Sequence, residues 1–343
     1  MEGATLKTRG SQLRLGLLVI AAAAIACGHA PGRTGPDDAP SSGVRLIPIH
    51  TPKGDFRVWT KRVGSNPRVK VLLLHGGPGA THEYFEAFDG YFPSAGIEYY
   101  YYDQLGSFYS DQPDAPELWD VPRFGEEVEQ VRSALGLDRS SFYLLGQSWG
   151  GLLAIEYALA YPQNLKGLVI SNMMASGPAY GEYARTVLMP AMDPAVLTEI
   201  QSLEAAGRTG DPRYMELLIP SFYVQHILRM PHDQWPDPVQ RTFEHLNAKV
   251  YVPMQGPSEL GVGGKIASWD RTAELAKISV PTLVIGARFD TMDPTHMEWM
   301  AGQVQRGRYL FCPKGSHLAI YDDQEVYMKG ILRFIRDVDE GRF

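Results

Sequence analysis

A serine between two glycines is the clearest chemical feature of this sequence. Gly146-Gln147-Ser148-Trp149-Gly150 has the spacing Gly-x-Ser-x-Gly and lies between a strand-like run at 141–145 and a helix-like run at 152–161. A tight turn from strand to helix needs glycine beside the serine and exposes the hydroxyl for nucleophilic attack. The alternative is a glycine-rich turn with an incidental serine, and it accounts less well for this context.

A serine hydroxyl needs a histidine base, which in enzymes with this turn follows the acid in chain order. Of the nine histidines, only His296 and His317 follow the serine outside an expected insertion. His296 falls in an expected helix, whereas His317 lies in a loop after the last expected strand. A loop at the carboxyl edge of a sheet can bring an imidazole to the serine, so we assign His317 as the base.

The acid is expected after the preceding strand, which ends at residue 285. Asp290 lies in the segment that follows this strand, and it would hold the imidazole tautomer and stabilise the imidazolium. Asp293 is the alternative, but it precedes Pro294 and suits the N-cap of a helix. The predicted catalytic residues are therefore Ser148, Asp290 and His317.

The tetrahedral oxyanion of acyl transfer needs two N–H donors. One is expected from Trp149, the residue after the nucleophile, and the other from the loop His75-Gly76-Gly77-Pro78-Gly79. Gly77 is the expected donor in this loop because glycine lets the backbone approach the substrate. The alternative is a simple turn that ends a strand.

Alternating strands and helices would position these residues. Strand-like runs occur at 44–60 (a strand pair), 69–74, 97–102, 141–145, 165–171, 281–285 and 308–311, and helix-like runs at 124–135, 152–161 and 325–336. This alternation predicts an α/β fold with a mostly parallel sheet. The rhythm is lost over 172–270, which is helical and rich in aromatics, so we expect a core (44–171 and 271–343) carrying a helical cap.

Composition excludes several classes of protein. The 343 residues are 44% apolar and 21% charged, as in ordinary globular proteins. With 32 basic and 39 acidic residues the net charge is −7, so nucleic acid is not an expected partner. Two cysteines, Cys27 and Cys312, cannot build a disulfide framework or a four-ligand zinc site. The sequence holds no cluster of metal ligands, and we expect neither a metal nor a cofactor.

Residues 1–27 are typical of a bacterial secretory signal. Basic residues precede an uncharged run at 15–26, which as a helix would span about 18 Å, short of the roughly 30 Å hydrocarbon core. The run ends in Ala24-Ile25-Ala26-Cys27, which resembles a lipobox, so we expect lipidation of Cys27 and a membrane anchor. The alternative is an ordinary signal peptide cut before Cys27. Either way we expect export to the cell envelope, as an anchored or periplasmic protein, with residues 28–43 as a flexible linker.

Five motifs together resemble the prolyl aminopeptidase (proline iminopeptidase) family of α/β-hydrolases, which includes related L-amino-acid amidases. They are His-Gly-Gly-Pro-Gly at 75–79, Asp-Gln-Leu-Gly at 103–106, Gly-Gln-Ser-Trp-Gly-Gly at 146–151, Gln-Gly-Pro-Ser-Glu at 255–259 and Gly-Ser-His at 315–317. The resemblance extends from about residue 44 to the end. It implies an α/β-hydrolase fold and the release of an N-terminal residue, often proline, from peptides or amides without a metal.

The resemblance also implies that cap glutamates bind the substrate's free amine. Glu259 matches one of them, while Thr291 occupies the place where some relatives carry a second. The cap aromatics Phe222, Tyr223 and Trp235 could line a slot for a proline ring or could simply pack the cap.

Two alternatives to an aminopeptidase stay open. The same triad would serve a general amidase, esterase or lactonase acting on other small substrates. A catalytically inactive lipoprotein that binds a ligand in the cap groove is the alternative from another class, although the complete order Ser148, Asp290, His317 argues against it.

Overall fold

The computed structural model describes residues 43–343. The predicted signal segment, the lipidation of Cys27 and the linker up to residue 42 lie outside the described residues and stay predictions. Within the described part of the chain, no helix is both long and apolar enough to cross a membrane.

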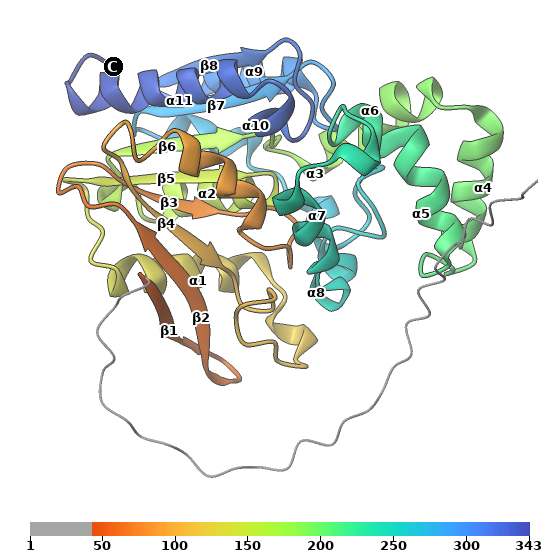
Figure 1. The fold of residues 1–343 in the computed structure, drawn as a ribbon, viewed down its shortest axis with the longest axis horizontal. Helices are drawn as coiled ribbons and strands as arrows, with labels where there is room; N and C mark the ends of the chain where they lie inside the picture. The colour runs from red at the N-terminus through yellow and green to blue at the C-terminus, as the bar shows by residue number, and fades with distance from the viewer. Residues whose placement is uncertain (1–42) are drawn as a thin grey trace, which may run out of the picture. The chain divides into compact units, whose positions relative to one another are not determined.

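An eight-stranded sheet forms the centre of the described unit (Figure 1). Its order is β1-β2-β4-β3-β5-β6-β7-β8; β2 pairs antiparallel with β1 and β4, and all other neighbours are parallel. This confirms the predicted α/β fold and mostly parallel sheet. The strands are β1 (Val44–Thr51), β2 (Gly54–Val63), β3 (Lys70–Leu74), β4 (Glu98–Asp103), β5 (Phe142–Gln147), β6 (Gly167–Ser171), β7 (Thr282–Ala287) and β8 (Gly307–Cys312).

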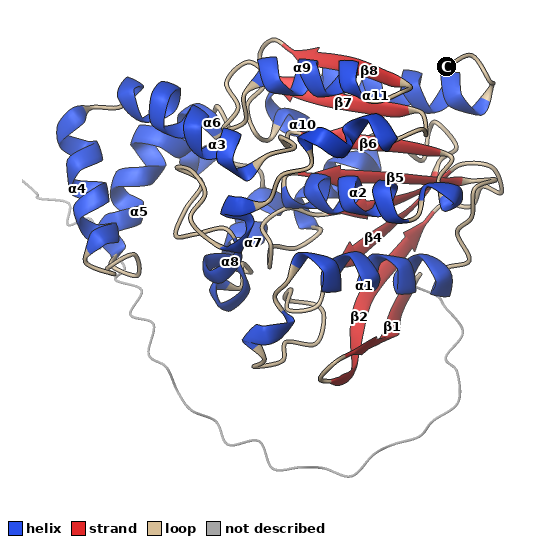
Figure 2. Ribbon diagram, turned by 180° about the vertical axis from the view of Figure 1, so that it is seen from behind, coloured by secondary structure: helices blue, strands red, loops and turns tan. Residues whose placement is uncertain are grey.

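Helices cover both faces of the sheet (Figure 2). Successive side chains of a strand point to opposite faces. In β3, Leu72 and Leu74 therefore join the core formed with α1, α2 and α9, while Val71 and Leu73 join the core formed with η1 and α11. The helices named here are η1 (Glu83–Gly90), α1 (Val121–Ala134), α2 (Trp149–Ala160), α9 (Pro294–Gln303) and α11 (Gln324–Asp339), and the short helix α10 (Ala319–Asp322) precedes α11.

The chain between β6 and β7 is mostly helical and lies to one side of the sheet (Figures 1 and 2). Its α-helices are α3 (Gly177–Tyr183), α4 (Pro194–Ala205), α5 (Pro212–Leu218), α6 (Val224–His226), α7 (Asp237–Glu244) and α8 (Ala248–Met254), and the π-helical turn η6 (Ile219–Tyr223) joins α5 to α6. We call this segment the cap. It is joined to the core where Arg241 of α7 donates to Glu86 of η1 at 2.7 Å and Asn247 donates to the Gly106 carbonyl at 2.7 Å.

Candidate active site

Ser148 occupies the turn between β5 and α2. Its φ of 55° lies in the left-handed region, which is costly for any residue other than glycine and is typical of functional turns. The flanking glycines are required by space. A Cβ on Gly146 would lie 1.9 Å from the Gly150 carbonyl oxygen, and one on Gly150 would lie 1.9 Å from that of Leu74. The turn therefore presses tightly against β3 and holds the serine at the end of the sheet.

His317 and Asp290 meet from loops that follow β8 and β7. His317 Nδ1 lies 2.7 Å from Asp290 Oδ1, and the carboxylate also accepts from Asn172 Nδ2 at 2.6 Å and the Met292 N–H at 3.1 Å. Asp290 is fully buried, so these donors compensate the loss of water around its charge. Because Asp290 binds Nδ1, Nε2 is the ring nitrogen left available for proton transfer, and His317 lines the same cavity as Ser148.

The competing residues have other partners. Asp293 caps α9, where its carboxylate accepts from the Thr295 N–H at 2.8 Å. His296 lies on the same helix, and its Nε2 accepts from the Ala175 N–H at 3.4 Å. Neither residue belongs to the Asp290–His317 pair.

The two residues predicted to supply oxyanion donors, Gly77 and Trp149, have backbone N–H groups that are free in the part of the chain that the structure describes. Gly77 lines the same cavity as Ser148, and its N–H has no hydrogen-bond partner within residues 43–343. The preceding N–H, of Gly76, is already donated to the Tyr84 hydroxyl at 2.7 Å. Trp149 begins α2, so its N–H has no acceptor within the helix. Both groups can therefore donate to an oxyanion.

Three of the sequence motifs are joined behind this site. The Trp149 indole N–H donates to Gln104 Oε1 at 2.7 Å, and Gln104 Nε2 donates to the His75 carbonyl at 3.1 Å. The Asp-Gln-Leu-Gly motif thus ties the nucleophile turn to the His-Gly-Gly loop.

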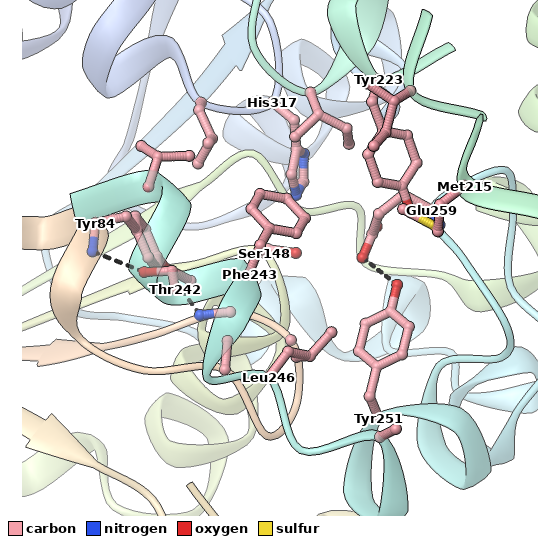
Figure 3. A pocket seen from close by; sticks show the side chains of 18 of the residues that line it. Tyr84, Ser148, Met215, Tyr223, Thr242, Phe243, Leu246, Tyr251, Glu259 and His317 are labelled. Carbon is pink, nitrogen blue, oxygen red and sulfur yellow. Dashed lines mark hydrogen bonds between the residues drawn. The ribbon is translucent and has the colours of Figure 1, made fainter. Parts of the chain in front are cut away.

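Ser148 and His317 open into a cavity of about 400 Å³ between core and cap (Figure 3). Its lining is mostly apolar, and Glu259 is the only carboxylate among the described residues that line it. Within residues 43–343, no group of three or more His, Cys, Asp or Glu side chains is arranged to hold a metal ion. The cavity suits an apolar substrate that carries one positive charge.

Glu259 follows α8 and is held by tyrosines. Its Oε1 accepts from the Tyr251 hydroxyl at 2.6 Å (Figure 3), and its backbone carbonyl accepts from the Tyr180 hydroxyl at 3.0 Å. Burial raises the pKa of Glu259, while His317 and the hydrogen bond from Tyr251 oppose that rise. A cationic amine in the cavity would therefore find a single, desolvated carboxylate.

Comparisons with known proteins agree with this geometry. The profile of the alpha/beta hydrolase fold family matches residues 70–324. The chain is 56% identical over 297 residues to the proline iminopeptidase of Flavobacterium johnsoniae, covering 87% of this chain and 99% of that protein. It is also 56% identical to the proline iminopeptidase of Elizabethkingia meningoseptica, with 87% and 100% covered. This chain belongs to the proline iminopeptidase family.

Two solved structures of similar proteins have the same fold as this chain. The crystal structure of the Mycobacterium smegmatis proline iminopeptidase superposes with a TM-score of 0.74 at 28% identity, covering 88% of this chain and 100% of that one. That of VinJ superposes with a TM-score of 0.79 at 29% identity, covering 86% and 99%.

Only two of the three aromatics proposed for the substrate slot reach the cavity. Tyr223 and Trp235 line it, whereas Phe222 does not. Phe222 is fully buried and packs against Tyr223 and His226 within the cap. Successive side chains of a helical turn point in different directions, and here Tyr223 faces the cavity while Phe222 packs within the cap.

Several residues that form hydrogen bonds to the site residues were not predicted from the sequence. Asn172 donates to Asp290, Tyr251 to Glu259, and Tyr84 to the Gln147 amide. Asn172 directly follows a strand end, which is a signal that could have been used. Tyr84 and Tyr251 carry no comparable signal, because only the folded chain brings their hydroxyls to these partners.

The pKa of His317 sets the expected pH dependence of activity. Burial lowers this pKa, but the charge of Asp290, its hydrogen bond and the charge of Glu259 together hold it above the ordinary value of 6.5. A general base must be neutral, so kcat/KM should fall as pH drops through this raised pKa, earlier than for a free histidine.

A neutral ester is the suitable substrate for this measurement, because it has no amine of its own to titrate. A profile that stays flat down to about pH 4.5, well below any ordinary histidine pKa, would contradict a histidine base.

Proposed function

We propose that this protein is a serine aminopeptidase that releases N-terminal proline, or another small apolar residue, from peptides or amides. The single observation that carries this proposal is the position of Glu259, the one carboxylate among the described residues lining the cavity that contains Ser148 and His317. An aminopeptidase must recognise a charged amine next to the scissile bond, and Glu259 supplies the opposite charge. The relatives named proline iminopeptidase support the choice of proline.

The proposed reaction proceeds through an acyl-enzyme. With the substrate amine at Glu259, Ser148 Oγ attacks the carbonyl carbon while its proton passes to His317. The carbonyl oxygen becomes an oxyanion that accepts from the N–H groups of Gly77 and Trp149. Collapse breaks the C–N bond, and His317 returns the proton to the leaving nitrogen. Water then attacks the ester by the same route, which frees the amino acid and Ser148.

A general amidase or esterase with the same triad is the second candidate. The observation in its favour is Thr291, which stands where some relatives carry a second amine-binding glutamate. Its hydroxyl is buried and lies 3.2 Å from His317 Nδ1, so it faces the Asp290–His317 pair. With one carboxylate instead of two, the cavity would discriminate less strongly for a free amine.

Glu259→Gln separates these two candidates. A charge-assisted hydrogen bond contributes roughly 1.5–3 kcal/mol, so the variant should lose about 10- to 150-fold in kcat/KM for free-amine substrates such as proline p-nitroanilide. Small neutral esters should be nearly unaffected. N-acetylation of the substrate should cause a comparable loss in the wild type and little further loss in the variant.

Glu204→Gln is the matched control. Glu204 is also a cap carboxylate that accepts from a tyrosine hydroxyl, that of Tyr214, but it does not line the cavity. The Glu204→Gln variant should retain the wild-type preference for free-amine over N-acetylated substrates. If the wild type cleaved acetylated and free substrates equally well, the aminopeptidase proposal would fail and the general amidase or esterase would replace it.

We also propose that the enzyme acts from the bacterial cell envelope, anchored through a lipid on Cys27. This rests only on the sequence at 1–27, which lies outside the described residues. Palmitate labelling of the wild type but not of Cys27→Ser would support the anchor, and a soluble, unlabelled mature wild type would refute it.

A further inference from the structure

A chain of buried hydrogen bonds links the oxyanion loop, residues 75–79, to the loop that carries His317. The Gly76 N–H donates to the Tyr84 oxygen at 2.7 Å, and the Tyr84 hydroxyl donates to Gln147 Oε1 at 2.8 Å. Gln147 Nε2 then donates to the His317 carbonyl oxygen at 3.0 Å. All four residues are buried, and Gln147 directly precedes the nucleophile.

The two ends of this chain determine the direction of every bond in it. A backbone N–H can only donate and a backbone carbonyl can only accept. Gln147 must therefore turn its NH₂ toward His317 and its oxygen toward Tyr84. The Tyr84 oxygen accepts from Gly76 and its single hydrogen goes to Gln147. No hydrogen of the Tyr84 hydroxyl is left for substrate, so this group cannot itself be an oxyanion donor.

His75 forms a hydrogen bond with the peptide group that joins Gly76 to Gly77. The Gln104 N–H donates to His75 Nε2 at 3.1 Å, so the ring proton is on Nδ1, which donates to the Gly76 carbonyl at 2.8 Å. In a planar trans peptide the carbonyl of Gly76 and the N–H of Gly77 point in opposite directions. Holding the Gly76 N–H and carbonyl together therefore aims the Gly77 N–H.

The oxyanion loop packs closely against the turn that carries Ser148. A Cβ on Gly76 would lie 3.0 Å from Gln147 Oε1 and 3.1 Å from the Ser148 Cβ. The Gly76 peptide thus lies directly against the nucleophile turn, and a small rotation of it would move the Gly77 N–H relative to Ser148.

We propose that Tyr84 is a positioning residue for the oxyanion hole. Through Gln147, it fixes the position of the oxyanion hole relative to the loop that carries His317. This rests on the proposed function only in assigning Ser148, His317 and the Gly77 N–H to acyl transfer. It does not depend on which acyl group is transferred.

Tyr84→Phe tests the proposal because it removes the hydroxyl and keeps the ring. The oxyanion exists only in the transition state, so kcat should fall about 10- to 100-fold while KM changes less than about threefold. Affinity for a boronic acid, whose tetrahedral adduct on Ser148 places an oxygen in the hole, should fall by the same factor. Both p-nitrophenyl acetate and proline p-nitroanilide should show the loss in kcat.

Tyr321→Phe is the matched control. The Tyr321 hydroxyl donates to the Tyr84 backbone carbonyl at 2.9 Å, so this variant removes a hydroxyl bonded to the same residue but away from the loop. We expect its kcat and boronate affinity to stay within about twofold of the wild type. Thermal melting of both variants separates local misalignment from unfolding.

Gln147→Leu breaks the same chain at its other end and keeps the test independent of how Tyr84→Phe folds. It should lower kcat and boronate affinity in the same way, and the double variant should lose little more than either single one, since both act through one network. The proposal is overturned if Tyr84→Phe and Gln147→Leu keep wild-type kcat, if their losses simply multiply, or if kcat falls while boronate affinity does not. Failure to cleave the proline substrate while the ester is cleaved would instead count against the proposed function alone.

Discussion

Ser148→Ala is expected to lower kcat by about 10⁶-fold, with the fold intact. Without the hydroxyl no acyl-enzyme can form, and because triad members act as a unit, His317→Ala should cost about as much. Serine and alanine experience similar strain at the φ of 55°, so the melting temperature should change little.

The measurement is steady-state kcat on proline p-nitroanilide and p-nitrophenyl acetate, with thermal melting for each variant. Titration with a fluorophosphonate guards against traces of wild-type enzyme, because Ser148→Ala should not be labelled. Activity within about 100-fold of the wild type in either variant would show that another residue is the nucleophile or the base.

Asp290→Asn is expected to lower kcat by about 10⁴-fold. The carboxylate accepts from the Nδ1–H of His317, whereas an amide NH₂ at the same place would donate to Nδ1 and favour the tautomer with its proton on Nε2. That tautomer cannot take the proton of Ser148. The effect should appear in kcat for both ester and amide substrates.

Asp293→Asn provides the comparison three positions along the chain. Asn is also a good N-cap, and Asp293 contacts the first turn of α9 instead of His317. We expect kcat to change less than about threefold. The opposite order, with Asp293→Asn severe and Asp290→Asn mild, would move the acid to Asp293.

Much of the core could be predicted because its structure is encoded locally. A parallel strand covered on both faces appears in the sequence as a continuous apolar run, as residues 69–74 do, and β3 occupies Lys70–Leu74. The strand ends differ by up to three residues from the predicted ones, as is usual for element boundaries. The short helix η1 has no such signal, and yet it supplies Tyr84.

The sequence by itself determined which residue is the predicted nucleophile. Ser148 is marked by glycines within two residues of it. Gly146 is required by the turn itself, because a Cβ there would meet the Gly150 carbonyl, whereas Gly150 is required by the neighbouring β3, because a Cβ there would meet the Leu74 carbonyl. Chain order then pointed to His317 and Asp290, because loops that follow neighbouring parallel strands end at the same edge of a sheet.

The tertiary structure decided which side chains make contact. Phe222 and Tyr223 are equivalent in sequence, but only Tyr223 lines the cavity. The sequence favoured Asp290 over Asp293, and the structure shows the contact of Asp290 with His317 Nδ1 at 2.7 Å. Tyr84 and Gln147 lie 63 residues apart, and Gln147 and His317 lie 170 apart. Hydrogen bonds of this kind depend on how strands, loops and the cap pack in space, so no local pattern of residues could specify them.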